Sequence, residues 1–87
     1  MKVKENFILR TVAGNHVVVP VGTQNLNFKG IITLNDTGAF LWKQLQSDCS
    51  KEELLAALLE EYEVDEATAQ TGVDGFVEKL QEADLLV

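Results

Sequence analysis

The segment FKGIITLNDTGAFLW, residues 28–42, constrains the fold most, because a strand pattern changes there into a helical one without a loop. Side chains that alternate along Phe28–Leu34 predict a strand with Phe28, Gly30, Ile32 and Leu34 on one face and Lys29, Ile31 and Thr33 on the other. Asn35 is a good helix N-cap, and Asp36 suits the positive end of the helix dipole. The first helix is therefore predicted to be fixed directly to the end of a strand.

Upstream of this junction the chain reads as a β-hairpin. Phe7–Val12 and His16–Val19 are rich in β-forming residues, and Ala13-Gly14-Asn15 between them is a turn signal. Pro20 lacks a backbone donor and suits a strand end. With the strand at residues 28–34, this gives three strands before the first helix.

Downstream of the junction the pattern is helical throughout. Ser50 and Glu53 form a capping box, and Asp65 is a further N-cap. Three helices are predicted, at about Asp36–Gln46, Lys51–Tyr62 and Glu66–Ala83. The order of three strands and then three helices in 87 residues predicts one α+β domain, residues 1–87, with a three-stranded antiparallel sheet and a winged-helix-like arrangement.

Apolar side chains at helical spacing predict the core. The expected buried residues are Gly38, Leu41, Trp42 and Leu45 in the first helix, Leu54, Leu55, Leu58, Leu59 and Tyr62 in the second, and Ala69, Val73, Phe76, Val77, Leu80 and Ala83 in the third. The tail Leu85–Val87 is expected to dock on them. Phe40 lies off the first helix's apolar face, so it either packs under the N-terminal segment or stays exposed for an interaction.

Residue types that carry catalysis are scarce. Cys49 and His16 are the only cysteine and histidine, so these residue types cannot supply a four-ligand zinc site. No Gly-rich phosphate loop, nucleophile elbow or HExxH motif is present. We therefore expect a protein that is not an enzyme and uses no metal or cofactor. No apolar run approaches the ~20 residues that span a bilayer, so a cytoplasmic protein without membrane contact is expected.

Charge is distributed unevenly along the chain. Residues 1–35 carry four basic side chains and one acidic one, a net +3, whereas residues 36–87 carry three basic and thirteen acidic ones, a net −10. The acidic half should repel phosphates, although a winged-helix-like order also suggests DNA binding as an alternative. A recognition helix at residues 66–83 would have one Lys against four acidic residues, so no nucleic-acid partner is expected.

Two glycines interrupt the third predicted helix. Gly72 and Gly75 fall on one flank of its apolar face, together with Thr68 and Lys79. Each mid-helix glycine costs about 1 kcal/mol relative to alanine. Three interpretations are open: another part of the chain packs tightly against this flank, the helix tolerates two residues of low propensity, or the glycines form the wall of a groove that admits an extended peptide.

The segment LNDTGAFLW, residues 34–42, resembles the LNxTGAxxW signature of PqqD-like proteins. LLAALLEEYEVDEATAQTGVDGFVEKLQEADLL, residues 54–86, resembles the second and third helices of that family and its terminal Leu pair. The resemblance extends from about Phe7 to Val87 and is weakest through Val21–Asn27. It implies a RiPP recognition element, the domain that binds the leader segment of a ribosomally synthesised and post-translationally modified peptide.

The resemblance also implies where and with whom the domain acts. The leader would bind as an added antiparallel strand between the third strand and the third helix, and a separate radical SAM enzyme or leader peptidase would modify the precursor. The expected peptide-binding residues are Phe28, Lys29, Gly30, Ile31, Ile32, Thr33, Gly72, Val73, Gly75, Phe76 and Lys79. Which of the helix residues face the groove and which face the core stays open.

Two other possibilities also remain. The same fold could serve as a scaffold or regulatory subunit of an enzyme without any leader peptide. A free strand edge can also pair with a second copy, which leaves a homodimer open.

Overall fold

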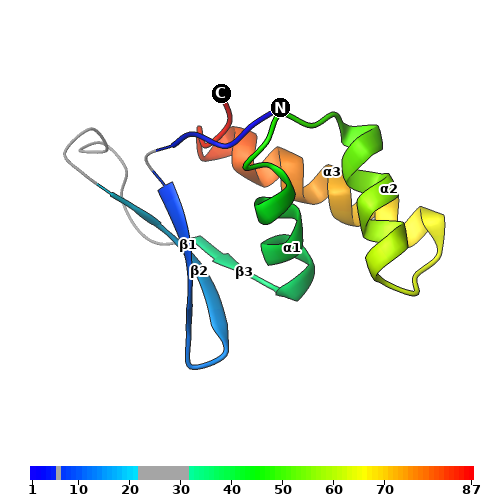
Figure 1. Cartoon of the computed structure of the whole chain (residues 1–87), viewed down its shortest axis with the longest axis horizontal. Coiled ribbons are helices and arrows are strands. Elements are labelled where there is room, and N and C mark those ends of the chain that lie inside the picture. The colour runs from blue at the N-terminus through cyan, green and yellow to red at the C-terminus, as the bar shows by residue number, and fades with distance from the viewer. Residues whose placement is uncertain (6, 22–31) are drawn as a thin grey trace.

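The computed structural model describes residues 1–5, 7–21 and 32–87 (Figure 1). Its elements follow the predicted order of three strands and three helices, and the α+β fold is confirmed. They are β1 (Phe7–Val12), β2 (Asn15–Pro20), β3 (Ile32–Leu34), α1 (Asp36–Gln44), α2 (Lys51–Glu61) and α3 (Glu66–Glu82). Each helix ends one or two residues earlier than predicted, because fraying last turns are poorly marked in sequence. Residues 28–31 of the expected third strand lie outside the described part of the chain.

The three strands form an antiparallel sheet in the order β1-β2-β3. Ala13 (φ 52°) and Gly14 (φ 81°) form the two-residue turn between β1 and β2, and paired positive φ angles are typical of a type I′ hairpin. β3 pairs with β2 from His16↔Leu34 to Val18↔Ile32. Among the described strands β3 therefore lies at the edge of the sheet, with β2 as its sole neighbour.

The junction between β3 and α1 consists of one residue, Asn35. Figure 1 shows β3 leading directly into α1. Asn35 Oδ1 accepts a hydrogen bond of 2.7 Å from the backbone N–H of Gly38, as a helix N-cap should. A Cβ atom on Gly38 would lie 3.1 Å from Asn35 Oδ1 and 3.2 Å from Leu34 Cβ, so glycine is needed for this close approach. His16 Nε2 lies 2.7 Å from Asp36 Oδ1, which ties β2 to the first turn of α1. α1 is thus held to the sheet at β2 and at β3.

The core lies where the three helices meet one face of the sheet. Its fully buried side chains include most of those predicted, with Trp42 and Leu45 at its centre. The predicted burial of Leu59 is wrong: 36% of its surface is exposed, whereas Leu54 and Leu58 are buried. Leu55, Tyr62 and Ala83, also expected to be buried, are half-buried and pack against the core. Phe40 is half-buried and packs edge-to-face on Tyr62, with ring centroids 5.7 Å apart.

The two ends of the chain lie side by side and are joined by backbone hydrogen bonds (Figure 1). Lys4 N–H donates to Leu85 C=O at 2.9 Å, and Val87 N–H donates to Lys2 C=O at 2.8 Å. Leu85 is fully buried, so the prediction that the tail docks is confirmed.

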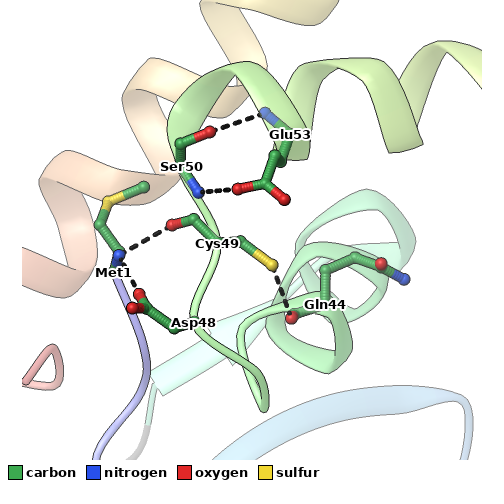
Figure 2. Close-up of polar contacts among 6 residues, drawn as sticks. All are labelled: Met1, Gln44, Asp48, Cys49, Ser50 and Glu53. Atoms are coloured by element: carbon green, nitrogen blue, oxygen red, sulfur yellow. Dashed lines mark hydrogen bonds and ion pairs between the residues drawn. The ribbon is translucent and has the colours of Figure 1, made fainter.

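A second set of contacts holds Met1 to the loop between α1 and α2 (Figure 2). The Met1 ammonium donates to Asp48 Oδ1 at 2.7 Å and to Cys49 C=O at 2.8 Å. The hydrogen bond and charge of this ammonium hold the pKa of Asp48 below its usual value. Cys49 Sγ donates to Gln44 C=O at 3.3 Å, which joins this loop to the end of α1.

Candidate functional site

A pocket of about 420 Å³ lies between β3, the start of α1 and the middle of α3. This is the place where the sequence resemblance puts the peptide groove. The lining residues are Thr33, Leu34, Asn35, Thr37, Gly38, Leu41, Thr71, Gly72, Gly75, Phe76 and Lys79. Leu34, Leu41 and Phe76 are buried, so the base of the pocket is apolar.

The α3 wall of the pocket is open because of its two glycines. Gly72 and Gly75 are exposed, and a Cβ atom built on either would meet no atom within 4 Å. The interpretation that another part of the chain packs tightly on them is therefore wrong for the described residues. No contact among the described residues accounts for these two residues of low helix propensity. Because glycine has no side chain, the helix backbone is uncovered along this side of the pocket.

The opposite wall is the edge of β3. The Lys79 ammonium on α3 donates a hydrogen bond of 3.1 Å to Thr33 C=O, so this carbonyl points away from β2. In an antiparallel pair, the N–H and C=O of one residue point to the same side of the strand. Thr33 therefore directs both a backbone donor and a backbone acceptor toward the pocket.

The first turn of α1 closes the third side of the pocket, and the sequence analysis missed its contribution. Asn35, Thr37 and Gly38 line this side, and Thr71 lines the pocket from α3. The LNDTG segment had been interpreted as a helix cap and as part of the family signature, without a place in the groove. Because the cap follows β3 without a loop, the same residues also have to lie beside the strand edge. This loop-free junction is the feature of the sequence that could have placed them at the groove. No comparable sequence signal marks Thr71.

The structure places the expected peptide-binding residues in three groups. The first group lines the pocket and contains Thr33, Gly72, Gly75, Phe76 and Lys79. The second group contains Val73, which is fully buried in the core, and Ile32, which is half-buried against the core; neither side chain lines the pocket. The third group, Phe28, Lys29, Gly30 and Ile31, lies outside the described residues. A peptide-binding role stays a prediction for all eleven.

Among the described residues that line the pocket, Lys79 is the one that carries a charge. Within the described part of the chain no carboxylate lies within 4 Å of its Nζ, whereas Lys4 and Lys51 pair with Asp84 and Asp74. The site thus presents an ammonium without an acidic partner, in a protein whose net charge is −7.

The chemistry of the pocket is that of a binding site. It combines an apolar base, a strand edge with backbone donor and acceptor, a stretch of bare helix backbone and one ammonium. Across residues 1–5, 7–21 and 32–87, no three His, Cys, Asp or Glu side chains are grouped so that they could hold a metal ion. No helix in the same residues has the length and apolar character needed to cross a membrane.

Known proteins resemble this chain in fold and in sequence. A solved structure described as TbiB1 in complex with the TbiA(beta) leader peptide superposes with a TM-score of 0.73 at 23% identity, covering 99% of this chain and 94% of that one. No curated protein matches the sequence. The family model for coenzyme PQQ synthesis protein D (PqqD) matches residues 15–86, which include β2, β3 and all three helices. The chain therefore belongs to the PqqD family.

Proposed function

We propose that this protein binds the leader segment of a ribosomally made precursor peptide as an added strand on the outer edge of β3. The observation that carries the proposal is the pocket beside that edge, whose α3 wall includes Gly72 and Gly75 with open space in front of them. Membership of the PqqD family supports it, as does the fold shared with TbiB1, a protein solved with a leader peptide bound.

Strand addition suits the backbone groups at this edge. An edge strand offers N–H and C=O groups that a second chain can pair with, whatever its sequence. Thr33 is the described residue that directs both groups outward, and the predicted strand residues 28–31 would lengthen the edge. Alternate side chains of a docked strand would then point toward the apolar base of Leu34, Leu41 and Phe76, where they could be selected.

The glycines account for the room that such a strand needs. A strand paired with β3 has its own backbone about 4.8 Å farther out, on the side where α3 lies. Side chains at positions 72 and 75 would project into that space. Bare helix backbone there lets the peptide lie between β3 and α3.

The rest of the proposal concerns the partners. We propose that the chain is one recognition domain, residues 1–87, that acts in the cytoplasm without catalysing a reaction itself. It would present the bound precursor to a separate modifying enzyme, either a radical SAM enzyme or a leader peptidase. The described residues that line the pocket include no pair of side chains that would act as nucleophile and base, which is compatible with this division of labour.

The test uses a labelled leader peptide from the short open reading frame nearest the gene, with binding followed by fluorescence anisotropy. Gly72→Leu combined with Gly75→Leu should abolish saturable binding, because two branched side chains would fill the groove, while a Cβ atom at either position meets none of the described residues within 4 Å. Ala67→Leu is the matched control, since Ala67 is exposed on α3 and does not line the pocket. Circular dichroism establishes that each variant is folded. Unchanged affinity in a folded Gly72→Leu/Gly75→Leu protein would refute the groove.

A further inference from the structure

Lys79 occupies the position that an incoming strand must use. Its Nζ lies 3.1 Å from Thr33 C=O and joins α3 to β3 across 46 positions of the chain. Thr33 C=O is also the acceptor that the N–H of an added strand would need, because it points out of the sheet. In the free protein, then, the acceptor at this edge is already bonded to the helix opposite.

The Lys79 ammonium has further N–H donors, and its positive charge has no carboxylate partner among the described residues. A lysine has three N–H donors, and one of them is accounted for by Thr33. Among the described residues, no carboxylate lies within 4 Å of its Nζ, and the others that line the pocket are uncharged. Lys79 is exposed, and its four-carbon stem lets the ammonium move while the helix stays in place.

We infer that the hydrogen bond from the Lys79 ammonium to Thr33 C=O, here called the latch, is exchanged when a peptide binds. This exchange makes the groove selective for an acidic peptide. When a strand docks, its backbone N–H takes Thr33 C=O, and the released ammonium pairs with an Asp or Glu side chain of that strand. A peptide that lacks this carboxylate has to displace the latch without providing a new partner. The inference rests on the proposed function, and it adds a rule about which peptides bind.

The latch in the free protein can be tested without any peptide. A carbonyl carbon resonates downfield when its oxygen accepts a hydrogen bond, so Lys79→Met should move the Thr33 ¹³C′ resonance upfield. Lys43→Met is the control, because Lys43 is exposed on α1 and lies outside the pocket. A Thr33 resonance that is the same in wild type and in Lys79→Met would refute the latch.

Selectivity is tested with the leader peptide described above and with versions of it in which each Asp or Glu is replaced by Asn or Gln. Wild type should lose about two- to fivefold in affinity when the one carboxylate opposite Lys79 is neutralised, a range typical of exposed ion pairs. Lys79→Met should bind both peptides equally, and it should bind the neutral peptide more tightly than wild type does, because it has no latch to displace. Lys79→Arg should keep the preference for the acidic peptide.

The outcomes separate the two proposals. If wild type binds every neutralised peptide as well as the original, the latch is refuted, whereas the proposal that the groove binds the leader is retained. The same holds if Lys79→Met keeps the full preference for the acidic peptide. If no version of the peptide binds wild type, the proposed function and the latch both fail.

Discussion

Replacing Gly72 and Gly75 with alanine should make the protein more stable and worse at binding its peptide. Both residues lie inside α3, and a Cβ atom at either meets nothing within 4 Å. Alanine therefore adds helix propensity without a clash, about 1 kcal/mol at each position and about 2 kcal/mol for the pair. In a domain of this size 1 kcal/mol corresponds to about 4–8 °C in Tm, so thermal unfolding resolves each step.

Binding should respond in the opposite direction. The two methyl groups project into the space where the strand is proposed to lie, and overfilling a packed interface costs about 1–3 kcal/mol. The double variant should therefore bind the leader about 5- to 150-fold more weakly, measured by isothermal titration calorimetry. Gln81→Ala is the control, because Gln81 is exposed on the same helix and does not line the pocket. A double variant that is more stable and binds as well as wild type would refute the role given to the glycines.

Two further predictions concern the frame of the site. Gly38→Ala should destabilise the protein by about 1–3 kcal/mol in chemical denaturation, because its Cβ would lie 3.1 Å from the Asn35 oxygen that caps α1; unchanged or raised stability would contradict this. Hydrogen bonds from the Thr68 side chain and backbone hold the pKa of Asp65 below its usual value. The ionised carboxylate therefore stabilises the start of α3 fully at pH values above the unfolded-state pKa of 3.8. This stabilisation is lost as the pH falls through the lower folded-state pKa. Asp65→Asn should therefore lose part of the drop in Tm between pH 5 and pH 2, and an identical drop in both proteins would contradict the prediction.

The helices could be predicted well because their signals are local. Asn35, Ser50 and Asp65 each cap a helix in the structure as their sequence context indicates, since a cap needs only the next three residues. The buried face of α3 follows from its spacing for the same reason. Leu59 was misassigned because local spacing marks the width of an apolar stripe, whereas burial depends on what packs against it.

The pocket could be predicted only in part. Its location followed from the family resemblance, and the flank with Gly72 and Gly75 followed from helical geometry. Whether those glycines face packed atoms or open space depends on residues far away in the chain, and the sequence left both possibilities. The contact between Lys79 and Thr33 is of the same kind, because it exists only once α3 has docked beside β3.

Val73 illustrates the limit of helical spacing. It follows Gly72 directly, so its side chain is turned about 100° farther round the helix, and the sequence could not decide on which side of the groove boundary it falls. The structure places it fully in the core, behind the glycine wall. Asn35 and Thr37, in contrast, were not assigned to the groove, because Asn35 was explained as a helix cap and Thr37 was considered only as part of the LNDTGAFLW signature.

Hydrogen exchange at the amide of Thr33, followed by NMR with and without the leader peptide, tests strand addition most directly. In the free protein this N–H points toward the pocket, so it should exchange quickly compared with the amides that pair β3 to β2. If the leader adds as a strand, the Thr33 amide should become strongly protected at saturation, and resonances of Gly72 and Gly75 should shift with it. If saturating peptide leaves the exchange rate of Thr33 unchanged, the leader does not pair with β3 and the central claim is wrong.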